Sequence, residues 1–252
     1  MVTSVPPPKT RRRMFDDASR DVDRFGLLLV VTVVSIVMLA LVNLDGLDGG
    51  LAPQIWVIVT TVLVSSTLLL ALRASGISQR WFRISAILVV IIVVANVINA
   101  ILQAAGVATI SNSIRGAPPA TLVILAALAP VAVVHRLLQH RQVRTSTLLG
   151  AIAAYLLIPV AYFYAFEAVD FYGAVPFLGT AESTTTIMYF SLSTVTTLGY
   201  GDYGAASDFG RLLATSEALV GQIYLVTFVA MIVGLLAQGR SQRSDDADRD
   251  VT

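Results

Sequence analysis

The residues best suited to chemistry form one run of seven, Thr196-Thr197-Leu198-Gly199-Tyr200-Gly201-Asp202. Its two glycines alternate with larger residues, and glycine adopts backbone angles that residues with side chains resist. Such a run can turn successive backbone carbonyls to one side, where their oxygens replace the water around a dehydrated cation. Thr197 adds a hydroxyl oxygen at one end of the row. The pattern therefore predicts a strip of oxygen ligands for a cation.

The composition indicates where such a strip would lie. The chain has 252 residues, of which 56% are hydrophobic and 13% charged, whereas a soluble domain carries about 25% charged residues. Apolar runs of the roughly 18 residues that a membrane helix needs recur along the chain. The absence of cysteine excludes disulfides and cysteine metal sites. We find no acid/base pair, nucleophile or phosphate-binding loop, so we expect neither an enzyme, nor a cofactor, nor a nucleic-acid partner.

Six apolar segments predict six transmembrane helices in an all-α polytopic fold. They cover residues 25–42, 55–72, 84–102, 120–138, 148–166 and 209–236. A shorter segment, 182–195, begins with polar residues and predicts a short helix that ends at the seven-residue run. Glu182 in its first turn would complement the positive end of the helix dipole. Residues 1–24 and 238–252 are polar and read as tails, the second of them disordered.

The cationic residues predict how these segments are oriented. The chain has 17 lysines and arginines. If the six spans cross the membrane in alternating directions, all of these residues except Arg115 and Arg211 fall in segments on the same side of the membrane. Cytoplasmic segments are enriched in these residues. We therefore expect both termini in the cytoplasm of a cell-membrane protein, with Asp202 at the outer end of the run.

The run and its surroundings resemble the signature of the potassium channel superfamily. Gly-Tyr-Gly alone is a common loop tripeptide, but here two threonines precede it, an aspartate follows it, and a hydrophobic helix lies on each side. The resemblance covers residues 148–236. The chain is similar to bacterial six-span channels with a two-span pore module. It implies a four-helix domain at 25–144 and a pore domain at 145–237, with outer helix 148–166, re-entrant pore helix 182–195, filter 196–201 and inner helix 209–236.

The resemblance also implies an assembly and an ion. One loop cannot surround an ion, so four chains are expected to meet at a central axis as a homotetramer. The filter residues are Thr196, Thr197, Leu198, Gly199, Tyr200 and Gly201, with K⁺ held at Thr197, Leu198, Gly199 and Tyr200. The implied activity is passive, potassium-selective conduction across the bilayer. The alternatives are a weakly selective cation channel or a subunit of a potassium transporter, although such transporters generally carry four pore loops in one chain.

Four residues are expected to support the filter: Asp202, Tyr189, Ser193 and Glu217. Ser193 stands where some bacterial channels carry a glutamate that pairs with the aspartate, so we expect Tyr189 to donate to Asp202 instead, or water to separate the two. Glu217 is the one acid inside a predicted span. A carboxylate within a membrane span is by default interpreted as having a functional role. We expect it to be hydrogen-bonded behind the filter or pore helix, or to act in gating.

Two further features concern the opening of the expected pore. Gly221 lies where the family places a hinge glycine in the inner helix, although glycine also permits close packing between helices. The fourth span carries no cation from Ala120 to Val134 and contains Pro130. A voltage sensor needs several charges there, because each is worth about 2.3 kcal/mol per 100 mV. Steep voltage gating is therefore not expected; the stimulus and the role of the first four spans stay open.

Overall fold

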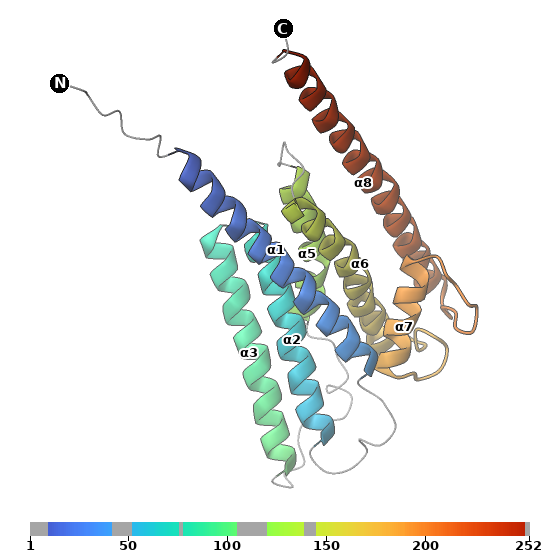
Figure 1. Cartoon of the computed structure of the whole chain (residues 1–252). Coiled ribbons are helices and arrows are strands. Elements are labelled where there is room, and N and C mark those ends of the chain that lie inside the picture. The colour runs from blue at the N-terminus through green and yellow to red at the C-terminus, as the bar shows by residue number, and fades with distance from the viewer. Residues whose placement is uncertain (1–9, 42–51, 76–77, 105–119, 139–144, 250–252) are drawn as a thin grey trace, which may run out of the picture.

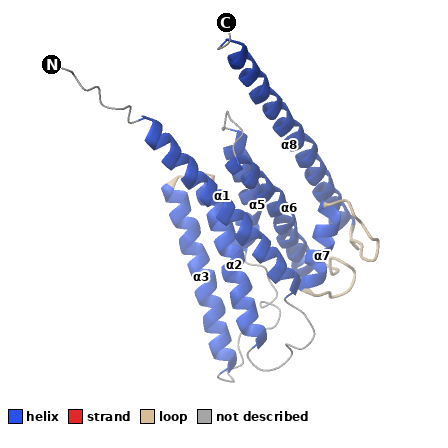
Figure 2. Ribbon diagram, in the orientation of Figure 1, coloured by secondary structure: helices blue, strands red, loops and turns tan. Residues whose placement is uncertain are grey.

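The computed structural model describes residues 10–41, 52–75, 78–104, 120–138 and 145–249, and in these ranges the chain consists of helices and loops (Figure 2). The helices of this described part are α1 (Thr10–Leu41), α2 (Ala52–Ala74), α3 (Gln79–Ala104), α5 (Ala120–Leu138), α6 (Thr145–Tyr172), α7 (Thr184–Val195) and α8 (Asp208–Arg249). The predicted all-α class is confirmed for this part of the chain.

Two helices extend into the segments that the sequence assigns to tails. Helix α1 begins at Thr10, so residues 10–24 are helical rather than an irregular tail. Helix α8 continues to Arg249, so the prediction of disorder after residue 237 is wrong for residues 238–249. The physical reason is that nucleation is the costly step of helix formation, and an established helix extends into polar sequence that lacks proline. The rest of the predicted tails, residues 1–9 and 250–252, lies outside the described residues.

The core is shared by α1, α2, α5 and α6. Leu28, Leu68, Ala126 and Leu157 come one from each of these helices and are fully buried. Two buried hydroxyls pair across this core, those of Ser35 on α1 and Thr67 on α2, which lie 2.8 Å apart, whereas the buried Ser65 hydroxyl has no hydrogen-bond partner among the described residues. These four helices form the scaffold against which the C-terminal helices pack.

Helix α3 lies at the edge of this scaffold. It packs on α2 and, less extensively, on α5. Its side chains are largely apolar and uncovered, with Ile87 and Ile91 exposed by 59% and 57%. An apolar face of this length is stable only in an apolar surrounding such as lipid.

An aromatic cluster fixes the start of α7 against the end of α6. The rings of Phe166 and Phe177 stack with centroids 4.4 Å apart, and Phe190 of α7 meets both edge-on at 5.6 and 5.5 Å. Phe166 and Phe177 are fully buried. The N–H of Phe177 also donates to a carboxylate oxygen of Asp170 at 2.7 Å. The connection between α6 and α7 is therefore held at several points, and it sets the position of α7.

The start of α1 and the end of α8 lie on the same side of the helix bundle (Figure 1). The start of α1, the end of α2, the start of α3, the end of α5 and the end of α8 all lie on that side. Arg73, Arg80 and Arg136 occupy these helix ends, whereas Arg211 lies in the first turn of α8 at the opposite side. Among described residues the cations therefore gather at one end of the bundle.

By length and composition, two helical segments of the described part are long and apolar enough to cross a membrane, Gln79–Ile98 and Thr147–Tyr172. Shorter apolar stretches occur in three more helices, at Phe25–Leu41, Ile58–Ala74 and Leu122–Leu137. Each of the five overlaps a predicted span. These segments and the exposed face of α3 agree with the membrane location that the sequence predicts.

Candidate functional site

Helix α7 ends at the seven-residue run and begins with a well-formed cap. Ser183 is the N-cap, and its hydroxyl oxygen accepts a hydrogen bond from the N–H of Thr186 at 3.2 Å. Such a cap satisfies one of the free amides of the first turn. The helix therefore starts two residues later than predicted, and Glu182 lies before its first turn, where it accepts a hydrogen bond from the hydroxyl of Thr180 at 2.8 Å.

The backbone of the run alternates in handedness. Thr197, Gly199 and Gly201 have positive φ angles of 57°, 52° and 83°, and Thr197 is the one non-glycine residue of the described chain with such an angle. Glycine adopts this region freely, but a β-branched residue such as threonine is rare there. Strain of this kind persists only where surrounding contacts impose it and is typical of functional sites.

Those contacts come from the end of α7. The N–H of Thr197 donates to the carbonyl of Thr194 at 3.0 Å, and the N–H groups of Leu198 and Gly199 donate to the carbonyl of Ser193 at 2.9 and 3.2 Å. The N–H and C=O of a trans peptide point in opposite directions. The carbonyls of Thr196, Thr197 and Leu198 belong to these same peptides, so all three point away from α7.

The Thr197 side chain lies at the inner end of this strip. Its hydroxyl donates to the carbonyl of Thr196 at 2.7 Å and accepts from the Gln222 amide of α8 at 3.4 Å. Farther along the run, Leu198 and Tyr200 are 57% and 67% exposed in the single chain. The run therefore presents backbone and hydroxyl oxygens on one side and leaves its larger side chains uncovered by the rest of the chain.

Asp202 is held by Tyr189, which is one of the two arrangements that the sequence leaves open. The Tyr189 hydroxyl donates to Oδ2 of Asp202 at 2.9 Å, and the N–H of Tyr203 donates to Oδ1 at 3.2 Å. The Tyr189 ring also stacks on Tyr200 at a centroid distance of 6.2 Å.

Ser193 supports the run through both its backbone and its side chain. Besides the two amides bound to its carbonyl, its hydroxyl oxygen accepts a hydrogen bond from the N–H of Gly199 at 3.1 Å. The hydroxyl is buried. Where a glutamate at this position would reach toward the aspartate, this serine instead binds the run directly.

Glu217 lies behind α7, as the sequence predicts. It is fully buried on α8, and its Oε1 accepts a short hydrogen bond from the Ser191 hydroxyl at 2.6 Å. The same hydroxyl lies 2.9 Å from the carbonyl of Pro159 on α6. Ser191 thus joins three helices at one point. The second carboxyl oxygen, Oε2, has no hydrogen-bond partner among the described residues.

Gly221 lies where α8 touches the end of α7. A Cβ atom at this position would come within 2.8 Å of both the carbonyl oxygen and Cγ2 of Val195. Helix α8 runs without interruption through Gly221. The glycine therefore has a packing role in this conformation, and its action as a hinge stays a prediction.

Three contacting residues were not singled out from the sequence. Ser191 bridges the helices as described, Gln222 reaches the Thr197 hydroxyl, and Tyr155 of α6 donates to the carbonyl of Val195 at 3.3 Å. Gln222 and Tyr155 could have been identified from the sequence, because a polar group inside an apolar span usually bonds to a neighbouring helix. Ser191 could not have been identified in this way, since it is one of several hydroxyl residues on α7.

Comparison with known families supports the assignment of this region. Residues 151–238 match the family model described as ion channel. Comparisons with curated proteins and with solved structures gave no match. The matched segment contains most of α6, all of α7, the run, and α8 as far as residue 238. Residues 151–238 are therefore similar to the pore domain of ion channels.

The hydrogen bond from Tyr189 to Asp202 yields a first prediction. In Tyr189→Phe the carboxylate loses its donor, so residues 198–203 should exchange their amide hydrogens faster and ion conduction should become unstable. Hydrogen exchange with mass spectrometry measures the first effect. Tyr203→Phe is the control, because Tyr203 contacts Tyr189 through its ring edge. Unchanged exchange and conduction in Tyr189→Phe would contradict the role assigned to this bond.

The close approach at Gly221 yields a second prediction. Gly221→Ala should push α8 away from Val195 and cost about 1–3 kcal/mol, as overpacking does. Gly234→Ala on the same helix should be tolerated, since no atom lies within 4 Å of its added Cβ. Thermal unfolding of the purified variants measures the difference. Equal unfolding temperatures, with fewer channel openings in Gly221→Ala alone, would instead favour a hinge.

Proposed function

We propose that the protein is a potassium-selective channel that lets K⁺ pass down its electrochemical gradient. The observation that carries this proposal is the direction of the Thr196, Thr197 and Leu198 carbonyls, all turned away from α7 by the hydrogen bonds of their own peptides. Positive φ angles at Gly199 and Gly201 continue the alternation along the run. A row of carbonyls of this kind replaces the hydration shell of K⁺ in potassium filters.

K⁺ would be held by backbone oxygens of Thr197, Leu198, Gly199 and Tyr200, with the Thr197 hydroxyl at the inner end. One chain supplies oxygens from one side only, so the proposal includes a homotetramer with four runs around a central axis. The exposure of Leu198 and Tyr200 and of α8 residues such as Ile223 in the single chain supports this assembly. These apolar side chains would be covered by neighbouring copies.

The proposed location is the cell membrane, with both termini in the cytoplasm. The support is the gathering of Arg73, Arg80 and Arg136 at the end of the bundle where α1 begins and α8 ends. This orientation puts Asp202 outside. It also makes α7 a re-entrant pore helix, whose carbonyl end points toward the membrane interior and favours a cation there.

Opening of the pore is proposed not to depend steeply on voltage. Within α5 the only basic residues are His135 and Arg136, in its last turn, and Pro130 lies inside the helix. A charge placed at a helix end crosses little of the membrane field. A strong sensor moves several charges per subunit through that field, at about 2.3 kcal/mol per charge per 100 mV.

Ion flux into liposomes tests this function. Purified protein should support an uptake driven by a potassium gradient, insensitive to sodium and blocked by barium. Gly199→Ala should abolish the preference for potassium, because alanine at a positive φ costs about 1–2 kcal/mol and distorts the strip. Gly204→Ala is the matched control, since its added Cβ also meets nothing within 4 Å and it lacks a positive φ.

The outcomes separate the alternatives. Equal sodium and potassium flux in the unaltered protein would indicate a weakly selective cation channel. Absence of flux would contradict conduction altogether. Retained selectivity in Gly199→Ala would contradict the role of the alternating backbone.

A further inference from the structure

One buried hydroxyl of α7 lies between two oxygen atoms of other helices. Oγ of Ser191 is 2.6 Å from Oε1 of Glu217 on α8 and 2.9 Å from the carbonyl oxygen of Pro159 on α6. A serine hydroxyl has one proton to donate, and a backbone carbonyl only accepts. If Glu217 is ionised, Ser191 faces two acceptors with one proton, so one of the two short contacts holds no proton.

A proton on Glu217 gives each contact its own proton. The carboxylic acid then donates from Oε1 to Oγ of Ser191, and Ser191 donates its proton to the carbonyl of Pro159. Both distances fall within the range of roughly 2.5–3.0 Å for an O–H···O hydrogen bond. A chain of two bonds then runs from α8 through α7 to α6, and Oε2 is the carbonyl oxygen of a neutral acid.

The surroundings of the carboxyl favour this neutral form. Glu217 and Ser191 are fully buried, and Oε2 has no hydrogen-bond partner among the described residues. In the same part of the chain no basic side chain pairs with the carboxyl, and Arg211 of α8 pairs instead with Asp208. Burying an unpaired carboxylate costs far more than burying the neutral acid.

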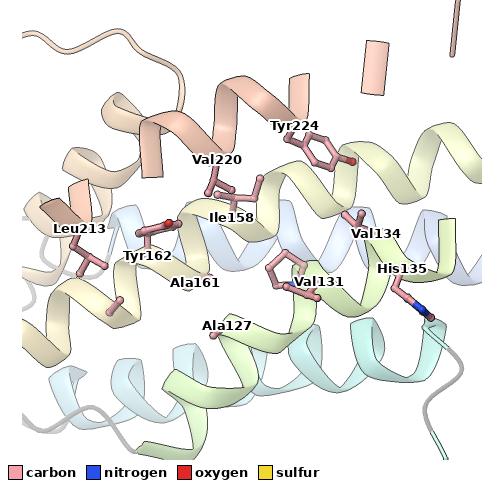
Figure 3. Close-up of a pocket in the computed structure, with 12 residues that line it drawn as sticks. Ala127, Val131, Val134, His135, Ile158, Ala161, Tyr162, Leu213, Val220 and Tyr224 are labelled. Carbon is pink, nitrogen blue, oxygen red and sulfur yellow. The ribbon is translucent and has the colours of Figure 1, made fainter. Parts of the chain in front are cut away.

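The nearby polar and open features of α6 and α8 do not supply the missing proton or solvation. On α6, the Tyr155 hydroxyl donates to the carbonyl of Val195 at 3.3 Å, and the Tyr162 hydroxyl lies 3.0 Å from that of Ser216. An apolar groove of about 660 Å³ passes along α8 between α5 and α6 (Figure 3). Its lining includes Leu213 and Val220 of α8 but neither Glu217 nor Ser191, so the groove does not hydrate the carboxyl.

We propose that Glu217 is a neutral carboxylic acid near neutral pH and positions helix α7 by donating a hydrogen bond to Ser191. It is a positioning residue, because it acts through α7 and does not reach the run itself. Gly221, one turn later, lets α8 contact the end of α7 at Val195. The proposal does not depend on which ion passes or on whether the protein conducts.

Infrared spectroscopy of the purified full chain, in a detergent without ester groups, tests the protonation. A neutral carboxyl has a C=O stretch at higher frequency than the amide bands, and an ionised carboxylate lacks it. We expect this band near neutral pH and its loss in Glu217→Gln. It should lie at the high-frequency end for such groups, because Oε2 accepts no hydrogen bond. Asp208→Asn is the control, since its fully exposed carboxyl on the same helix should contribute no band.

Two substitutions of similar size test the positioning role. In Glu217→Gln the side-chain amide still donates to Ser191, whereas Glu217→Met has neither donor nor acceptor. The amides of residues 192–199 should therefore exchange at the original rate in the glutamine variant. In the methionine variant they should exchange about fivefold faster, the effect of losing one intramolecular hydrogen bond. Hydrogen exchange with mass spectrometry measures both rates.

Each outcome supports or overturns the proposal. A spectrum that loses no carboxyl band in Glu217→Gln would show that the carboxyl is ionised. A glutamine variant that fails to fold would also count against a neutral acid, because a neutral amide of the same shape should be tolerated. Equal exchange in the two variants would remove the positioning role, whereas a methionine variant that alone fails to fold would support it.

Discussion

Three hydrogen bonds from the run to the end of α7 are the constraint on which the rest of the structure depends. An extended loop within a membrane carries amides and carbonyls that lipid cannot satisfy, so each must be bonded inside the protein or face a water-filled path. The amides of Thr197, Leu198 and Gly199 bond to Thr194 and Ser193. This arrangement turns the carbonyls of the same peptides to the opposite side, where those of Thr197 and Leu198 can face an ion and that of Thr196 accepts the Thr197 hydroxyl.

The bonds are useful only if α7 itself is held in place. Ser191 ties its middle to Pro159 on α6 and Glu217 on α8, and Tyr155 binds the carbonyl of Val195 at its end. Gly221 lets α8 approach that same residue. The inner helix therefore contacts the pore helix at two successive turns and Thr197 through Gln222. Any tilt of α8 would reach the run through these contacts.

Much of this region can be predicted from sequence because its signals are local. Hydrophobic length predicts where helices form, and the order of threonine, glycine and aspartate indicates the oxygen strip. The bond from Tyr189 to Asp202 was one of two arrangements that the resemblance to potassium channels left open. Ser191 could not be chosen in this way, since only the meeting of α6, α7 and α8 distinguishes it from nearby hydroxyl residues. The helical extensions of α1 and α8 were missed because polar composition was taken to indicate an irregular chain.

The central claim is that the carbonyls of residues 196–201 are ion ligands, and anomalous diffraction from crystals of the assembled protein soaked in rubidium tests it most directly. Rubidium is a heavy substitute for potassium. The account predicts a column of rubidium peaks along a fourfold axis, within bonding distance of the carbonyl oxygens of Thr197, Leu198, Gly199 and Tyr200. Peaks absent from this strip, or a strip whose carbonyls face α7, would contradict it.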